Sequence, residues 1–370
     1  MASGAPLPSI LSTARRRSAE ILLLLVAIVF IADLARRLAI GTLGWARVIG
    51  FIWDGTVLGL SVGLAGIGLA LTYSILRFAN FAHGDLVTAG AFAGWITTFL
   101  IAGLGSVAVE ALIYVGGPIP IDTGALGVSV TNTPIPIVAG LIVSAVTTAA
   151  LALGIDRLVF RPIRNESGIS LLIASVGVAL ALRYTIVFFF QAGTRGLTSG
   201  SATPDFVLTI DGGSVTVTAH EVTLAVVAAL LMLGTHLLLQ RTKLGTAMRA
   251  MADNRDLAQV TGIPTERVVR DTWLLGGGLA GASGFLIALE QGTLTTDLGW
   301  ALLLLIFAAV ILGGIGSAYG AILGGLLIGI SSRLSLVWIP SSLIIAAAFV
   351  AMIAVMLIKP AGLLGGVRTA

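Results

Sequence analysis

Three polar residues interrupt an apolar stretch near position 80: Asn80, His83 and Asp85, in the run Asn-Phe-Ala-His-Gly-Asp. A histidine beside a carboxylate could transfer a proton or begin a metal site. The other two histidines, His220 and His236, are far away in sequence, and no nucleophile motif accompanies the pair. The sequence therefore predicts neither a metal site nor a hydrolytic site. Two interpretations stay open: a break that lines a translocation path, or a short cytoplasmic turn in which Asn80 and Asp85 cap helix ends.

Arg183 is the second residue of interest, because it lies inside the apolar run SLLIASVGVALALRYTIVFFF (170–190). An arginine at membrane depth needs a polar partner, which could be a substrate carboxylate or a structural acid. The candidates for a translocation pathway are Asn80, His83, Gly84, Asp85 and Arg183. Three further acids, Asp54, Glu290 and Asp297, fall near predicted outer ends, where contact with water is the simpler interpretation.

Several chemistries find no support in the sequence. The chain contains no cysteine, so it has no thiol nucleophile or cysteine metal ligand. The loop 313–317 is rich in glycine but lacks the lysine of a phosphate-binding loop. We expect no catalytic residue, no metal and no cofactor in this chain. If ATP drives its activity, separate subunits must bind the ATP and its magnesium ion.

The elements that must position these residues are membrane helices. The chain has 370 residues, of which 57% are hydrophobic and 10% charged, with a mean hydropathy of +1.07. Soluble domains carry about 25% charged residues, so a soluble enzyme is excluded. Continuous apolar runs, rather than alternating ones, favour helices over a barrel. We predict an all-α polytopic bundle of nine or ten spans. The predicted spans are 20–40, 51–75, 85–104, 135–156, 168–190, 221–239, 272–290, 299–315, 319–337 and 341–358.

The first span is ambiguous, because its uncharged core 21–32 follows three arginines, as in a signal peptide. Asp33 can pair with Arg36 and Arg37 at helical spacing, which favours a retained helix. Most lysines and arginines fall on one side when the loop 240–271 is placed in the cytoplasm, although Arg36, Arg37 and Arg47 do not. The longest outer loops are then 105–134 and 191–220, and 207–218 reads as a β-hairpin around Asp211-Gly212-Gly213.

The cytoplasmic stretch 243–273 is predicted to form two short helices. Leu244, Ala247, Met248 and Met251 make one apolar face. Asp253 or Asn254 can cap a second helix, 255–261, with Gly262 after its end. Pro264 stops that helix, and Thr265 can cap the helix that re-enters the membrane. The exposed methionines and alanines, flanked by Arg249 and Arg255, would suit a groove on a partner. A connector that rests on lipid headgroups is the alternative.

Four segments resemble the LivH-type branched-chain amino-acid permeases of ABC importers: Asn80–Asp85 with 89–91, Gly245–Ala250 with Asp253, Ala258 and Gly262, the stretch 161–180, and the glycine-rich 310–329. The resemblance covers about 50–360, and urea permeases carry a close variant of the first motif. It implies that the cytoplasmic loop docks on an ATPase. The coupling residues it implies are Gly245, Met248, Arg249, Ala250, Asp253, Ala258 and Gly262.

The resemblance also implies an organisation and a set of partners. We expect an N-terminal extension with a first helix (1–47), an importer permease domain (48–360) and a short cytoplasmic tail (361–370). The expected partners are a second, LivM-like permease, two cytoplasmic ATP-binding subunits and an extracytoplasmic substrate-binding protein, all at the cell membrane and without nucleic acid. Open alternatives are a urea or short-amide permease, a stand-alone channel or secondary transporter and, more remotely, a membrane enzyme.

Overall fold

The computed structural model describes residues 10–104, 126–198 and 203–364, which are almost entirely helical. Each of the ten predicted membrane segments coincides with a helix. These helices are α1 (Ile10–Ala39), α2 (Trp45–Leu76), α3 (Ala82–Ala102), α6 (Pro134–Ile155), α7 (Gly168–Phe190), α8 (Ala219–Arg241), α11 (Thr265–Gln291), α12 (Leu298–Gly313), α13 (Ala318–Leu334) and α14 (Ile344–Ile358). Most of the predicted outer loop 105–134, and parts of the predicted 1–47 and 361–370 segments, lie outside the described residues.

Eight helices of the described chain are long and apolar enough to cross a bilayer. Three of them include short extensions: α6 continues into a π-helical turn (Asp156–Phe160), α13 into a 3-10 turn (Ser335–Val337), and α14 is preceded by another (Ser341–Leu343). α12 is apolar but has only 16 residues, and α1 is not among the eight. The chain is therefore a polytopic helical membrane protein, as predicted.

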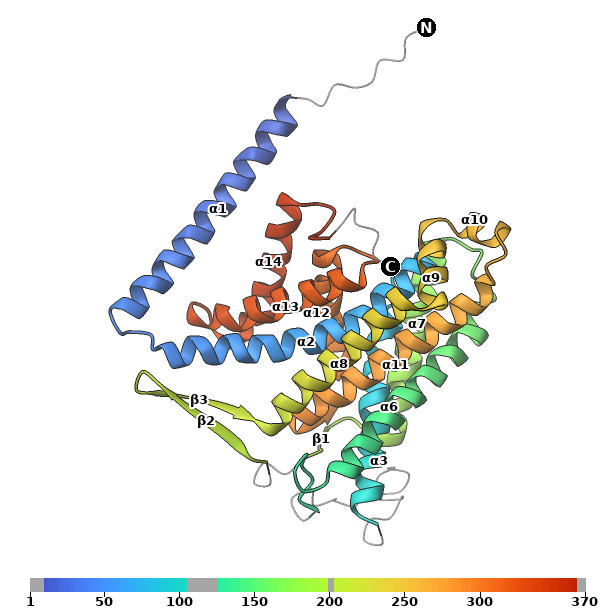
Figure 1. Ribbon diagram of the computed structural model, residues 1–370, viewed down its shortest axis with the longest axis horizontal. Helices are drawn as coiled ribbons and strands as arrows, with labels where there is room; N and C mark the ends of the chain where they lie inside the picture. Colours follow the sequence, from blue (N-terminus) through green and yellow to red (C-terminus); the bar gives the residue numbers. More distant parts are fainter. Residues whose placement is uncertain (1–9, 105–125, 199–202, 365–370) are drawn as a thin grey trace.

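Helix α1 stands apart from the bundle and approaches it near its C-terminal end (Figure 1). Asp33 accepts hydrogen bonds from Arg36 at 2.8 Å and Arg37 at 2.6 Å, which is the predicted i+3 and i+4 pairing. The same carboxylate accepts a bond from Trp338 Nε1 at 2.9 Å, and Phe30 packs edge-on against that indole. One small cluster thus ties α1 to the chain between α13 and α14.

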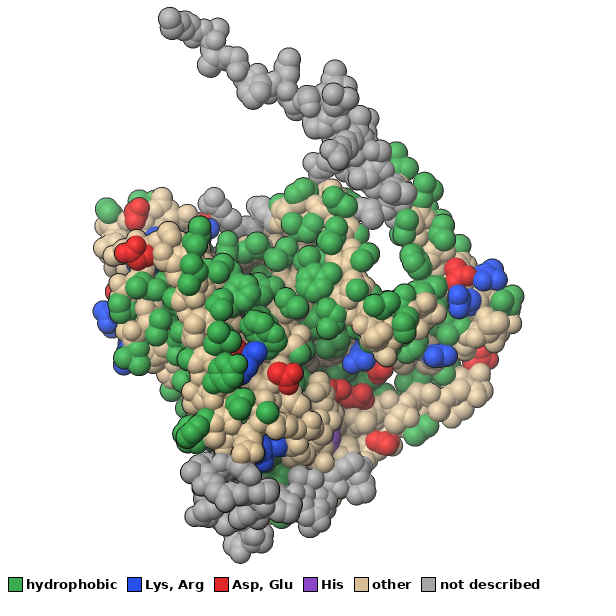
Figure 2. Space-filling view, turned by 180° about the vertical axis from the view of Figure 1, so that it is seen from behind, with side chains coloured by type: hydrophobic (Ala, Val, Ile, Leu, Met, Phe, Trp, Pro, Cys, Tyr) green, Lys and Arg blue, Asp and Glu red, His purple; other side chains and the backbone are tan. Residues whose placement is uncertain are grey.

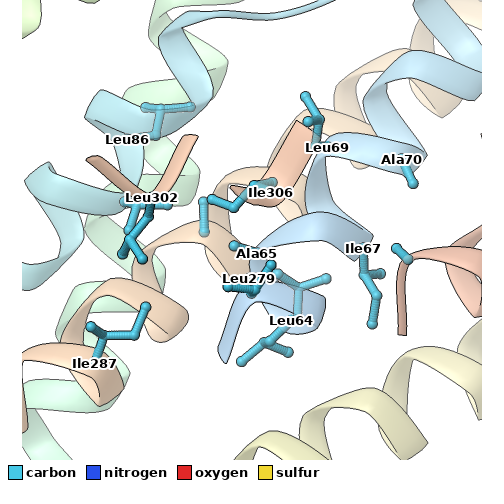
Figure 3. Packing of buried hydrophobic residues seen from close by; sticks show 14 of the residues in the cluster. Leu64, Ala65, Ile67, Leu69, Ala70, Leu86, Leu279, Ile287, Leu302 and Ile306 are labelled. Carbon is cyan, nitrogen blue, oxygen red and sulfur yellow. The ribbon is translucent and has the colours of Figure 1, made fainter. Parts of the chain in front are cut away.

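The core lies where α2, α3, α11 and α12 meet (Figure 3). Small residues let these helices approach closely, as is usual in membrane bundles. A Cβ on Gly90 of α3 would lie 2.2 Å from the Gly281 Cα of α11, and one on Gly55 of α2 would lie 2.6 Å from the Ile330 Cα of α13. The buried aliphatic side chains shown between them are Leu64, Ala65, Ile67, Leu69, Ala70, Leu86, Leu279, Ile287, Leu302 and Ile306.

The predicted β-hairpin is present as β2 (Asp205–Ile210) paired antiparallel with β3 (Gly213–Thr218). Asp211 and Gly212 both have positive φ in its two-residue turn, which is the conformation that such turns require. A second short pair, β1 (Thr194–Gly196) with β4 (Thr293–Thr295), was not predicted. It joins the chain after α7 to the chain after α11, so both pairs lie at one end of the bundle, called the hairpin end below.

The outside of the bundle is apolar. α6, α7 and α8 expose large aliphatic and aromatic side chains, including Val146, Ile173, Phe188 and Leu230. Figure 2 shows hydrophobic side chains over the middle of one face, with few charged ones among them. A soluble protein would not leave such a surface uncovered, so these faces contact lipid or another membrane subunit.

The opposite end of the bundle carries the cytoplasmic loop as α9 (Lys243–Asp253) and α10 (Arg255–Val260). Asn254, rather than Asp253, caps α10 by accepting the Leu257 N–H at 3.0 Å. Gly262 has φ +86° just after α10, as predicted. The prediction for Thr265 was wrong: Pro264 occupies the N-cap position, and Thr265 is the first helical residue of α11. The helix begins one residue earlier than expected because the Pro264 carbonyl oxygen already accepts the Val268 N–H, at 3.1 Å, as the first bond of the helix.

Candidate functional site

Asp85 and Arg183 form a buried ion pair, although they are far apart in sequence. Arg183 Nε and Nη2 both donate to Asp85 Oδ1 at 3.2 Å. The aspartate side chain is fully buried and the arginine side chain is 18% exposed. Asp85 lies in the first turn of α3, where the helix dipole also favours a negative charge. The intramembrane arginine therefore has a protein carboxylate as its partner.

Trp300 covers the outer side of this pair. The guanidinium carbon of Arg183 lies 4.4 Å from the centre of the indole ring, a cation–π contact. Trp300, on α12, is 42% exposed. The pair is therefore shielded by an aromatic side chain at the edge of α3, α7 and α12, rather than lying open to water.

The neighbouring motif residues contact other helices. His83 Nε2 lies 2.9 Å from the Ala65 carbonyl oxygen of α2, so that nitrogen carries the proton and donates. Gly84 packs against α12, since a Cβ there would lie 2.7 Å from the Gly299 carbonyl oxygen. Asn80 Oδ1 accepts the Ala82 N–H at 3.1 Å, while its buried Nδ2 has no hydrogen-bond partner within the described chain.

The structure thus separates the roles of the two possible helix caps. Neither residue is the N-cap of α3, which is Phe81 and has no side-chain cap bond. Asn80 accepts a bond within the preceding turn, and Asp85 pairs with Arg183 of α7. The five pathway candidates converge on the start of α3, which contacts α2, α7 and α12 through them. Movement of any of these helices would therefore displace the start of α3.

The coupling-loop residues fall into a buried set and an exposed set. Gly245, Met248 and Ala258 are buried, Arg249 and Ala250 are partly buried, and Asp253 and Gly262 are exposed. The expectation of exposed methionines was wrong: Met248 and Met251 are 1% and 2% exposed. The apolar face of α9 was predicted correctly, but it packs onto the bundle instead of a partner.

Helix α10 carries the apolar side chains that face outward. Leu257 is 60% exposed and Val260 is 85% exposed. They fall three residues apart on one helix face, a spacing that brings their side chains together. Sequence reasoning missed them because it assigned the docking face to α9; the same spacing rule applied to α10 would have found them.

The loop is held to the bundle by polar contacts. Arg77, in a left-handed conformation after α2, donates to the Ala252 carbonyl, and Arg249 donates to the Leu239 carbonyl of α8. Glu266 at the start of α11 accepts two bonds from Arg164, at 2.8 and 3.0 Å, and Arg255 of α10 lies 3.9 Å away. Displacement of α9 and α10 together would therefore act on α2, α8 and α11.

Comparison with known proteins agrees with this architecture. Residues 51–359 match the family described as the branched-chain amino acid transport system permease component. The high-affinity branched-chain amino acid transport system permease protein LivH of Escherichia coli (strain K12) is 29% identical over 314 residues, covering 85% of this chain and 94% of LivH.

Two further relatives come from other organisms. The permease protein BraD of Pseudomonas aeruginosa is 26% identical over 313 residues, with 84% of this chain and 94% of BraD covered. The "Probable branched-chain amino acid transport permease protein LivH" of Methanocaldococcus jannaschii is 30% identical over 318 residues, with 82% and 88% covered. No solved structure matches the chain. The helical membrane fold and the extent of these matches show that the chain belongs to the branched-chain amino acid transport system permease family.

Proposed function

We propose that this chain is the transmembrane subunit of an ABC importer for branched-chain amino acids. The relatives named above support the substrate class. The chain has no phosphate-binding motif of its own, so two ATP-binding subunits at the cytoplasmic end supply the energy. A second, LivM-like permease completes the membrane part, and a substrate-binding protein delivers the amino acid to the hairpin end.

The exposed apolar face of α10 supports the coupling role most directly. Leu257 and Val260 project from a helix whose neighbour α9 is anchored through buried Met248 and Met251. An ATPase groove that covers this face would bury two aliphatic side chains and would move α9 with them. The remaining implied coupling residues then hold α9 and α10 in place for this contact.

The test is co-purification of the ATPase subunits with the Leu257→Ser/Val260→Ser variant. We expect association to fall at least tenfold, because two apolar side chains lose their burial at the interface. Binding-protein-stimulated ATP hydrolysis and leucine uptake should fall with it. Leu158→Ser is the matched control, since Leu158 is 81% exposed at the same end of the bundle but lies outside the loop. Unchanged association in the double variant would contradict the docking assignment.

Uptake assays decide the substrate and the energy source. The complete transporter in liposomes should import leucine, isoleucine and valine in preference to urea, and only with ATP inside. Preference for urea would support the short-amide alternative. Uptake by this chain alone without ATP would support a stand-alone transporter.

We also propose that the junction of Asn80, His83, Gly84, Asp85 and Arg183 borders the translocation pathway. Its position where α3 meets α2, α7 and α12 supports this, as does the partial exposure of Arg183 and Trp300 on one face of the bundle. Movement of α7 relative to α3 would widen or narrow the gap between these two helices at the junction.

A further inference from the structure

A cavity of about 160 Å³ lies among α2, α8, α11 and α13 at the hairpin end of the bundle. Four ionisable side chains and two aliphatic ones line most of this cavity. They are Asp54, Glu221, Glu290 and Arg333, with Leu58 and Ile287. The four ionisable side chains are partly buried, and Asp54 and Glu290 are within electrostatic reach of one another, of Glu221 and of Arg333.

The acidic side chains in this cavity do not form ion pairs with Arg333. Within the described chain, Asp54 and Glu290 make no hydrogen bond or ion pair, and Arg333 lies within 4.0 Å of no carboxylate oxygen. Arg333 Nε is buried and has no partner there. Asp85 and Arg183 show the contrary arrangement, in which the acid and base pair directly. Partly buried charges held apart are costly, so a ligand that bridges them would gain strong interactions.

The helices around the cavity are held in fixed positions. Gly55, beside Asp54, lets α2 approach the Ile330 backbone of α13, one turn before Arg333. Ser283 of α11 donates to the Ser61 carbonyl of α2 at 2.9 Å. The charged groups are therefore placed by close backbone packing and need little reorganisation to bind a ligand.

Glu221 differs from the other two acids because it already has partners. Its Oε2 accepts the Thr218 N–H at 2.8 Å in a capping box and the Trp53 indole N–H at 3.2 Å. Asp54 and Glu290 are thus the carboxylates that remain available to a ligand, and both face the same cavity as Arg333.

We propose that this cavity binds an α-amino acid as its zwitterion. The ammonium group lies between Asp54 and Glu290, the carboxylate meets Arg333, and an aliphatic side chain packs against Leu58 and Ile287. The excess of acids disfavours a simple anion, and urea carries neither charge. This inference rests on the proposed function and assigns to it a substrate-binding site near the hairpin end.

Cysteine accessibility tests the site, because the natural chain contains no cysteine to interfere. The Leu58→Cys variant of the complete transporter, reconstituted in nanodiscs, is treated with a cationic methanethiosulfonate, and modification of this chain is read by its mass. We expect the introduced thiol to react in at least one of the ATP-free and ATP-bound states. Leucine should slow the reaction about tenfold, whereas leucinamide and 4-methylpentanoate, which each lack one charge, should not.

Val207→Cys is the control, since Val207 is 60% exposed on the hairpin and outside the cavity; leucine should leave its reaction rate unchanged. Three results would overturn the proposal: no reaction of the Leu58→Cys variant in either state, equal rates with and without leucine, or equal protection by the two analogues.

Charge variants give an independent measurement. Arg333→Gln and Glu290→Gln should each raise the KM for leucine uptake about tenfold while the complex still assembles. Asp297→Asn, an exposed acid at the same end, should not change KM. If the natural transporter imports leucine and either cavity variant, Arg333→Gln or Glu290→Gln, keeps the natural KM, this inference fails and the proposed function stands. If it imports no aliphatic amino acid, the proposed function fails.

Discussion

The Asp85–Arg183 pair shows how one contact within the bundle holds two helices together. Each group is a charge that would be expensive alone at membrane depth. Paired at 3.2 Å, and covered by Trp300, they neutralise one another at the edge of α3 and α7. The pair therefore stabilises the junction whatever passes beside it.

Removing one member of the pair should be worse than removing both. Asp85→Asn or Arg183→Gln leaves a buried charge unpaired, and we expect a loss of about 3–5 kcal/mol in unfolding free energy. The double variant should recover at least half of that loss. Thermal unfolding of the purified chain, followed by tryptophan fluorescence, measures the difference. A double variant as unstable as the sum of the single ones would show that the two residues act independently.

Gly84 allows a separate test of the same junction. Gly84→Ala would place a Cβ 2.7 Å from the Gly299 carbonyl oxygen, so α3 and α12 must move apart. We expect a destabilisation of about 1–3 kcal/mol and reduced uptake. Gly177→Ala in α7 is the control, since a Cβ there meets nothing within 4 Å. Equal melting temperatures for the two variants would contradict close packing at Gly84.

At the scale of elements, the ten helices could be predicted because each contains an apolar run, and eight of them are long and apolar enough to cross a bilayer. Their contacts could not. Asp85 and Arg183 lie on separate helices, and no pattern in either helix indicates the other. Glu290 lies at the end of α11, as predicted, whereas Asp54 is the tenth residue of α2. Hydropathy predicts the depth of a residue in the membrane but not which neighbouring helix its side chain faces, so the cavity that both acids share with Arg333 was not predicted.

The cytoplasmic loop shows the same limit. The helical period gave an apolar face of α9, and the caps Asn254 and Thr242 account for where its helices begin. An apolar face can pack on its own bundle or on a partner, and the period is identical in both cases. Only the tertiary contacts of Met248 and Met251 distinguish α9, which is buried, from α10, which is exposed.

Gly245 determines how α9 leaves α8. A Cβ at this position would lie 2.1 Å from the Leu239 carbonyl oxygen, so Gly245→Ala must displace α9 from its seat. We expect ATPase association and stimulated ATP hydrolysis to fall at least fivefold, with little change in membrane insertion. A displaced α9 should lose roughly 1 kcal/mol of binding free energy at the ATPase interface, which corresponds to about a fivefold loss of affinity. Gly234→Ala in α8, where a Cβ meets nothing within 4 Å, should behave like the natural chain. Both quantities are measured on the co-purified complex.

At the scale of the whole molecule, the buried core of the bundle contains no described residue of α1. Helix α1 contacts α14, and its Asp33 and Phe30 contact Trp338. The family match begins only at residue 51. Within the described residues, helix α1 therefore lies outside both the buried hydrophobic core and the residues that match the family.

Removal of residues 2–41 should leave the bundle able to fold. We expect the shortened chain to retain at least half of the leucine uptake of the full transporter, because the core of α2, α3, α11 and α12 is untouched. Trp338→Phe, which keeps the ring but loses the bond to Asp33, is the milder control. Uptake and the yield of assembled complex are measured together, and loss of assembly in the shortened chain would show that α1 is needed for it.

Helix α2 has 32 residues and so extends for about 48 Å at the usual rise per residue. Asp54 near its start lines the charged cavity, and Arg77 just after its end bonds the backbone of α9. A shift of this helix would change both places at once, and would thereby link occupancy of the proposed amino-acid site to the affinity of the proposed ATPase partner for α9 and α10. Linkage is reciprocal: if an amino acid in the cavity tightens ATPase binding by some factor, the bound ATPase tightens amino-acid binding by the same factor.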